Sequence, residues 1–192
     1  MTDPGPFFID PCTGLVHPAR QVPSPNQDLR PPGCGIELAI IHAISLPPGV
    51  FGSGWIDHLF TNTLAPQAHP YFQQIAHLRV SAHLLIDRHG SITQYVPLDR
   101  RAWHAGASSF QQRSECNDYA VGIELEGDEQ TAYTDAQYAT LTALLRTLRA
   151  HYPSVTPERI VGHSDVAPQR KTDPGPAFDW ERLYAGLSSP GT

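Results

Sequence analysis

The chain has 192 residues, 40% of them hydrophobic, which is enough for one domain with a sizeable core and short for two. Lys and Arg number 13 against 19 Asp and Glu, a formal net charge of −6, and no basic run stands out. This balance argues against a nucleic-acid or membrane binder, because both need clustered positive charge, and no apolar stretch approaches the ~20 residues of a membrane span.

The N-terminus and the cysteines indicate a cytoplasmic protein. Asp3 and Pro4 stand where a secretory signal would have a basic region followed by an unbroken apolar run. Cys12, Cys34 and Cys116 are odd in number, widely spaced and outside any Cys-x-x-Cys pattern, which is typical of free thiols in a reducing compartment. We therefore expect no export, no disulfide framework and no thiolate metal cluster.

The first 63 residues are expected to give an arm, a strand and a short helix. Residues 1–34 are rich in proline without a sustained period, which predicts an extended arm packed on the domain. Residues 35–44 form an apolar, β-branched run between glycine and a Pro-Pro turn, typical of a strand buried on both faces. Residues 53–63 predict a short helix with Ser53 as candidate N-cap. Its apolar face would comprise Trp55, Leu59 and Phe60.

Two further strand patterns follow. Residues 81–96 contain two alternating runs across Asp87–Gly90, which predicts a hairpin with a short glycine-containing turn. Residues 119–127 predict a strand whose side chains alternate between two faces. Val121, Ile123 and Leu125 would share one face, and Gly122, Glu124 and Glu126 the other.

The C-terminal part predicts two helices and one strand. A helix should begin after Thr134, with Gln137 completing a capping box, and end at Tyr152. Residues 158–163 predict a short edge strand, and residues 178–187 a short helix. The whole chain is therefore expected to be one α/β domain, in which helices flank a central mixed sheet. The apolar stripe of the first helix, expected in the core, comprises Tyr138, Leu141, Leu144, Leu145 and Leu148.

Histidines at strand ends are the first candidates for chemistry, since sites in open α/β sheets collect at strand ends. His42 and His163 both occupy such positions, and Lys171 and Asp173, two residues apart, should project to the same side of the following loop. Two imidazoles and a carboxylate are the ligand set of a catalytic zinc site that keeps a position open for water.

Ordinary structural roles compete with each of these assignments. A histidine at the end of an apolar strand is more often a hydrogen-bonded core residue than a ligand, and His83 and His104 are rivals of similar standing. Glu124 and Glu126 could be an acid and base pair or a solvated strand face. Lys171 could be a surface lysine, and Asp173 could initiate a turn. The histidines expected in loops or on the surface are His17, His58, His69, His77, His89 and His151.

Four segments carry a resemblance to a known family, at residues 40–57, 69–127, 133–138 and 161–180. Through these segments the chain resembles the zinc amidases of the amidase-2 family, and among these it is most similar to the cytoplasmic anhydro-muropeptide amidases. The likeness spans roughly residues 15–187 and is most specific in HSDVAPQRKTDPGPAFDW. It implies a fold related to T7-type lysozyme and the peptidoglycan recognition proteins. It also implies zinc-dependent hydrolysis of the bond between 1,6-anhydro-N-acetylmuramic acid and L-alanine during cell-wall recycling.

The resemblance also assigns residues. It implies one Zn²⁺ per chain on His42, His163 and Asp173, with Glu124 and Lys171 in acid/base and transition-state roles. Contacts with substrate are expected at Arg79, Trp103 and Ala167.

The expected partner is a small anhydro-muropeptide, and we expect no binding to nucleic acid or to a membrane. The chain is expected to form a single amidase domain over residues 1–192 and to be a monomer. The alternatives are a phage-type or exported amidase that cuts polymeric murein, a peptidoglycan-binding module without turnover, and, more distantly, a glycosidase built on Glu124 and Glu126.

Overall fold

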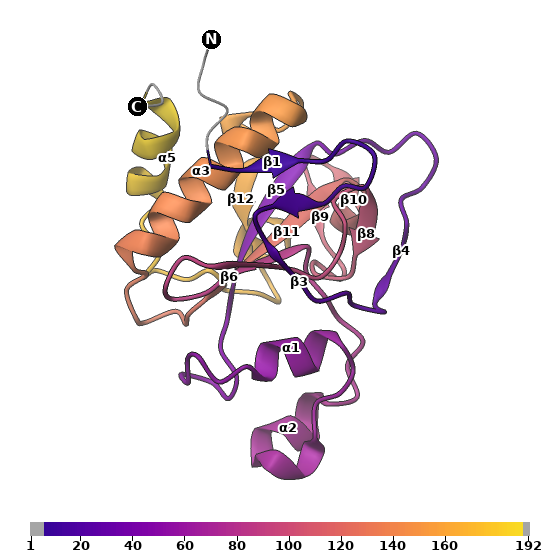
Figure 1. Cartoon of the computed structure of the whole chain (residues 1–192), viewed down its shortest axis with the longest axis vertical. Helices are drawn as coiled ribbons and strands as arrows, with labels where there is room; N and C mark the ends of the chain where they lie inside the picture. Colours follow the sequence, from indigo (N-terminus) through magenta and orange to yellow (C-terminus); the bar gives the residue numbers. More distant parts are fainter. Residues whose placement is uncertain (1–5, 190–192) are drawn as a thin grey trace.

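The computed structural model describes residues 6–189, and its centre is a six-stranded mixed sheet (Figure 1). The strand order is β12-β5-β11-β6-β7-β3. The first four strands in this order are parallel, β7 is antiparallel to β6, and β3 is parallel to β7. The strands are β12 (Ile160–Gly162), β5 (Leu38–Ile44), β11 (Ala120–Glu126), β6 (Leu84–Ile86), β7 (Ile92–Gln94) and β3 (Arg20–Gln21). The predicted α/β domain with a central mixed sheet is confirmed, as are the hairpin β6–β7 and the edge position of β12.

The two faces of β11 have the alternation predicted from sequence. Val121, Ile123 and Leu125 lie in the largest core cluster, against helix α3 (Asp135–His151). Helix α5 (Trp180–Ser188) lies beside α3, and both cover the same face of the sheet (Figure 1). Glu124 and Glu126 therefore point to the opposite face, where both are buried instead of solvated.

Helix α3 begins as its sequence predicts. The Thr134 hydroxyl accepts from the Gln137 amide at 3.1 Å, and the Gln137 side chain accepts from the Thr134 amide at 3.1 Å, which completes the capping box. The helix ends at Tyr152, and the expected apolar stripe is buried. Helix α3 packs against one face of the sheet, so the opposite face of the sheet is available for the site.

Two short helices lie on the other side of the sheet, α1 (Trp55–Phe60) and α2 (Pro70–Ile75), the latter after a 3₁₀ turn η1 (Pro66–Ala68) (Figure 1). The assignment of Ser53 as N-cap of α1 is wrong: the cap is Gly54, at φ 75°, and the Ser53 hydroxyl donates to the Leu46 carbonyl at 2.5 Å. Helix α2 was not predicted from the sequence.

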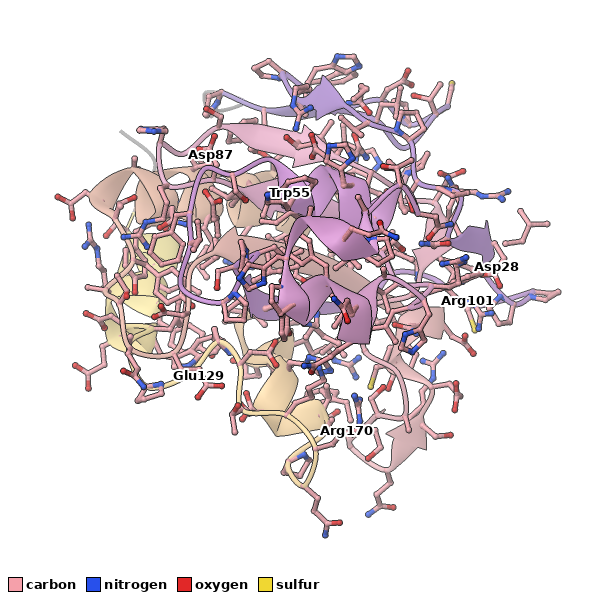
Figure 2. All side chains as sticks on the ribbon, turned by 90° about the horizontal axis from the view of Figure 1, so that it is seen from below. Asp28, Trp55, Asp87, Arg101, Glu129 and Arg170 are labelled. Atoms are coloured by element: carbon pink, nitrogen blue, oxygen red, sulfur yellow. The ribbon has the colours of Figure 1, made fainter. Side chains whose placement is uncertain are left out.

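The N-terminal segment is extended and packs on the domain through short strands. Residues 1–5 of the predicted arm lie outside the described residues. Within the rest, β1 (Phe8–Ile9) pairs with β2 (Val16–His17), β3 adds an edge to the main sheet, and β4 (Gln27–Leu29) pairs with β8 (Arg100–Ala102). Asp28 and Arg101 lie side by side at this margin (Figure 2), in an ion pair of 2.6 Å.

The remaining short elements lie in the connections. They are β9 (Ser109–Phe110), β10 (Arg113–Ser114), the 3₁₀ turns η2 (Cys116–Asp118) and η3 (Pro157–Arg159), and helix α4 (His163–Val166). All three cysteines are free thiols, as expected. Within residues 6–189, no helix combines the length and apolar character required to cross a bilayer.

Candidate functional site

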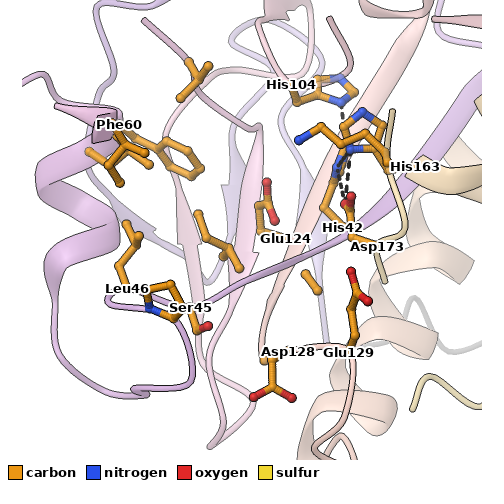
Figure 3. Close-up of a pocket in the computed structure, with 18 of the residues that line it drawn as sticks. His42, Ser45, Leu46, Phe60, His104, Glu124, Asp128, Glu129, His163 and Asp173 are labelled. Carbon is orange, nitrogen blue, oxygen red and sulfur yellow. Dashed lines mark hydrogen bonds and ion pairs between the residues drawn. The ribbon is translucent and has the colours of Figure 1, made fainter. Parts of the chain in front are cut away.

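Three side chains converge at the carboxyl end of the central strands (Figure 3). His42 leaves β5 near its end, His163 is the first residue of α4 directly after β12, and Asp173 belongs to the loop that follows α4. His42 Nδ1 lies 3.0 Å from His163 Nδ1, and the two nitrogens lie 3.2 and 3.1 Å from Asp173 Oδ2. The ligand atoms of the three residues all lie within 4.8 Å of one another, a geometry that can hold a metal ion.

The hydrogen bonds outside this cluster test whether it suits a cation. His163 Nε2 lies 3.1 Å from the Ala105 carbonyl oxygen, which only accepts, so Nε2 carries a proton and neutral His163 presents a bare Nδ1 lone pair. His42 Nδ1 faces this lone pair at 3.0 Å, beside a carboxylate. When His42 Nδ1 also presents a lone pair, a cation between these atoms stabilises the arrangement, and two imidazoles with one carboxylate are ligands that zinc prefers.

Burial and the cluster itself shift the ionisation of its members. Burial lowers the pKa of His42 to about 4, because the charged form loses hydration, although Asp173 opposes the shift. Burial alone would raise the pKa of Asp173, but hydrogen bonds with His163 and His42 outweigh it and hold that pKa well below its usual value. The result is a neutral imidazole beside a carboxylate, the protonation states that metal binding requires.

Glu124 lies beside the cluster on the neighbouring strand, where the register of β11 and β5 pairs it with His42. Its side chain is buried, and Oε2 has no hydrogen-bond partner among the described residues. Burial and then the Asp173 carboxylate raise the pKa of Glu124 well above its ordinary value, while Lys171 opposes the shift. A carboxyl group in this environment can keep a proton at a pH at which an ordinary glutamate has lost it.

Lys171 lines the same cavity from the loop that carries Asp173. The Ala167 carbonyl accepts from the Lys171 amide at 2.9 Å, and the Asp173 carbonyl accepts from the Ser164 amide at 2.9 Å. These bonds fold the loop back on α4, so that the side chains of Lys171 and Asp173 both reach the cavity. Their spacing of two residues had predicted that they project to the same side of the loop. The half-buried ammonium therefore lies where negative charge could develop.

The cavity has a volume of about 650 Å³ and two unlike walls. The cluster, Glu124 and Lys171 form one wall, and apolar side chains from the β5–α1 loop, α1, α2 and the segment after α2 form the other, as Figure 3 shows for Leu46 and Phe60. Ser45, Asp128 and Glu129 contribute polar groups at the cavity. The apolar residues include Leu46, Pro48, Leu59, Phe60, Tyr71, Ile75, Leu78 and Val80.

The three substrate-contact candidates have different positions. Trp103 is half-buried and lines the cavity. Arg79 is exposed, donates to the carbonyls of His77 and Leu78, and does not belong to the lining. Ala167 is buried below the loop, outside the lining, where its carbonyl accepts from the Lys171 amide.

The rival histidines have other partners. His83 is fully buried and contacts Arg30 and the Arg100 carbonyl, each at 3.1 Å, as a satisfied core histidine does. His104 is not in the metal-binding cluster but contacts His42, with Nδ1 2.9 Å from Nε2. Glu126 shares a face of β11 with Glu124 but lies outside the cavity lining and accepts from the Gly52 amide at 2.6 Å, so it does not pair with Glu124 as acid and base. The six histidines expected in loops or on the surface are exposed or half-buried.

Sequence reasoning did not find the apolar wall or the contact between His104 and His42. The wall combines side chains from α1 and from α2, and α2 was not expected. His104 follows Trp103 in the run AWHAG. Its position next to an aromatic residue that lines the cavity was the one sequence feature that could have indicated a role for His104 at the site.

The chain is similar to known proteins over most of its length. The model of the family described as N-acetylmuramoyl-L-alanine amidase (Amidase_2) matches residues 33–176. The 1,6-anhydro-N-acetylmuramyl-L-alanine amidase AmpD of Salmonella typhimurium is 58% identical over 175 residues, 91% of this chain and 93% of that relative. A crystal structure of a Se-Met AmpD derivative has a TM-score of 0.91 at 55% identity, and the alignment covers 94% of this chain and 99% of that one.

A more distant structure contains a bound substrate. It is the complex of the amidase AmiD from Escherichia coli with anhydro-N-acetylmuramic acid-L-Ala-D-γ-Glu-L-Lys. Its TM-score is 0.59 at 28% identity, and the alignment covers 79% of this chain and 57% of that one.

Proposed function

The chain belongs to the N-acetylmuramoyl-L-alanine amidase family, and we propose that it hydrolyses the amide bond between 1,6-anhydro-N-acetylmuramic acid and L-alanine in anhydro-muropeptides, as a step of bacterial cell-wall recycling. The observation that carries this proposal is the 58% identity with AmpD over nearly the full length of both chains. The cluster of His42, His163 and Asp173, with Glu124 and Lys171 beside it, supplies the groups that amide hydrolysis needs.

We propose Zn²⁺, one per chain, as the cofactor, held by His42, His163 and Asp173. When bound, zinc makes water acidic enough to supply a nucleophile at neutral pH and polarises a carbonyl group. The three side chains supply two neutral nitrogens and one negative oxygen, which offset half of the charge of the ion. Their positions on β5, α4 and the following loop leave the cavity side of the cluster accessible to substrate.

Glu124 is proposed to handle the protons of the reaction. Its raised pKa suits a carboxylate that takes a proton from the attacking water and then gives it to the leaving nitrogen of L-alanine. Because Oε2 has no partner among the described residues, that oxygen is free to accept the proton. Protonation of the nitrogen is required because an amide anion is a poor leaving group.

Lys171 is proposed to stabilise the negative oxygen of the tetrahedral intermediate. Its side chain lines a cavity that is partly closed to solvent, where the interaction between a cation and an oxyanion is stronger than in water. The apolar wall and Trp103 fit the carbon faces of a sugar ring and the L-alanine methyl group. Arg79 and Ala167 remain proposed substrate contacts that require rearrangement or a longer ligand, since neither lines the cavity.

We further propose that the enzyme acts in the cytoplasm as a monomer. The three free thiols suit a reducing compartment, and all proposed site residues come from one chain. The complex of AmiD with an anhydro-muramyl tripeptide supports a small-molecule substrate, because the two proteins share this fold.

Digestion of purified anhydro-muropeptide, with products identified by mass, tests the proposal. We expect free anhydro-N-acetylmuramic acid and the intact stem peptide, loss of activity with a chelator, and much slower release from intact sacculi. Comparable rates on sacculi would favour a polymer-cutting amidase. Binding without cleavage, in protein that contains stoichiometric zinc, would favour a recognition module.

A further inference from the structure

The segment His104–Ala105, just after β8, contacts both histidines of the metal-binding cluster. His104 Nδ1 lies 2.9 Å from His42 Nε2, and the Ala105 carbonyl oxygen lies 3.1 Å from His163 Nε2. We infer that this segment sets the tautomer of both histidines, with His104 as the positioning residue for His42. The inference rests on the proposed metal site.

The chemistry of imidazole makes such partners necessary. A neutral histidine carries one ring proton, and its other nitrogen is the one that can bind a metal. For His42 Nδ1 to face the cluster with a lone pair, Nε2 must carry the proton and have an acceptor. The Ala105 carbonyl is such an acceptor for His163, and His104 Nδ1 is placed to be one for His42.

The position of His104 is fixed from two sides. Its backbone amide and that of Ala105 both donate to Asn117 Oδ1, at 3.2 and 2.8 Å. The imidazole lies directly on Gly122 of β11, where a Cβ atom would come within 2.4 to 2.8 Å of three ring atoms. A glycine at position 122 therefore makes room for this ring, and the ring cannot move toward the sheet.

The hydrogen bonds of His104 separate a positioning role from simple packing. Its Nε2 is buried without a partner in the described part of the chain, so the contact with His42 is the only hydrogen bond that the ring makes there. A buried polar group left unpaired costs free energy, which an apolar side chain of similar size would avoid. The one polar contact that offsets this cost is directed at a residue of the metal cluster.

His83, the neighbour of His104, shows the contrast. Its ring centroid lies 5.6 Å from that of His104, but both of its nitrogens have protein partners. His83 Nδ1 accepts from the Gly122 amide at 3.0 Å, and Nε2 lies 3.1 Å from the Arg100 carbonyl oxygen. Both nitrogens of His83 thus have partners in the core, whereas the one hydrogen bond of the His104 ring among the described residues is with a metal-cluster residue.

Zinc affinity, measured by competition with a chromophoric chelator, tests the inference without reliance on turnover. His104→Leu removes the acceptor at similar volume, and we expect zinc to bind about 10–100-fold more weakly. His104→Asn places Oδ1 where Nδ1 lies and should restore most of the affinity. Ile123→Val, on the opposite face of β11, is the control for a general loss of packing and should bind zinc like the parent protein.

Two further measurements cover the case in which His104→Leu does not fold. Gly122→Ala displaces the ring without altering its chemistry and should also weaken zinc binding. Nitrogen-15 NMR of zinc-loaded parent protein should show a hydrogen-bonded proton on His42 Nε2, which His104→Asn retains.

The outcomes distinguish the two proposals. Parental zinc affinity in His104→Leu or, where that variant does not fold, in Gly122→Ala would overturn the positioning role. Equal loss in the Asn and Leu variants would do the same. A parent protein that binds no zinc would instead overturn the proposed metal site.

Discussion

His42 and Glu124 occupy paired positions on two adjacent parallel strands, so that both side chains leave the same face of the sheet at its carboxyl edge. The pairing places a metal-binding imidazole and a proton-handling carboxyl group side by side without a contribution from any flexible loop.

Replacement of Glu124 by Gln should separate catalysis from metal binding. The amide keeps the shape of the side chain but cannot take up a proton, so kcat should fall by about 10²–10⁴. Zinc content should stay near one per chain, because Glu124 is not in the cluster of possible ligands. Single-turnover kinetics beside elemental analysis checks both points, and loss of zinc from this variant would assign Glu124 to the metal instead.

Lys171 is the only lysine in the chain, which allows a chemical test as well as a genetic one. Lys171→Ala should lower kcat by about 10²–10³ while zinc is retained, because one group that stabilises the oxyanion is lost. An amine-selective acylating reagent should inactivate the parent protein as Lys171 is modified, and bound product should slow that modification. Peptide mass mapping identifies the site, and full activity of the acylated protein would refute the role.

Asp173→Ala should lose zinc and activity together. It removes the carboxylate that both histidines contact, and it leaves two neutral imidazoles as the remaining protein ligands. Added zinc at high concentration should restore part of the activity. Asp128→Ala is a matched control, since this carboxylate also lines the cavity but lies outside the cluster, and it should keep full zinc occupancy.

The raised pKa of Glu124 predicts how stability depends on pH. The folded protein keeps a proton on Glu124 that the unfolded chain releases above pH ~4.5, so this contribution to stability is full below that pH and declines as pH rises through the folded pKa. Glu124→Gln cannot ionise and should therefore melt above the parent protein at pH 8, in the presence of chelator, but not at pH 4.

Each kcal/mol of this difference corresponds to about 2–4 °C in Tm for a chain of this size. Glu115→Gln, at an exposed position, is the control and should show no such dependence on pH. Equal melting temperatures of Glu124→Gln and the parent protein at both pH 4 and pH 8 would show that ionisation of Glu124 does not destabilise the folded protein.

Local patterns in the sequence were sufficient for the central strands β5 and β11 and for the long helix. The apolar run that contains His42, the alternation around Glu124, and the capping box at Thr134 each correspond to one physical requirement of one element. Helix α2 was not predicted because its N-cap is the His69 side chain, which accepts from the Tyr71 amide at 3.1 Å, and histidine is not among the residues that usually mark a helix start.

The candidate site was only partly accessible to such reasoning. His42, His163 and Asp173 could be proposed from strand ends and from resemblance, but their mutual distances depend on strand order, which no local pattern encodes. The same limit applies to His104, whose partner His42 is 62 positions away in the chain. The apolar wall was missed for a related reason, since Leu46 and Tyr71 meet at one cavity only after the chain has folded.

The two walls of the cavity rest on separate core clusters. Phe60 and Leu59 of the apolar wall belong to a cluster with Phe72 and Tyr95, whereas the strand residues behind the metal-binding cluster, such as Ile40, pack with Ala105 and Val166. A substitution in the apolar wall can therefore change the shape of the substrate site without a change in the packing that supports the reacting groups.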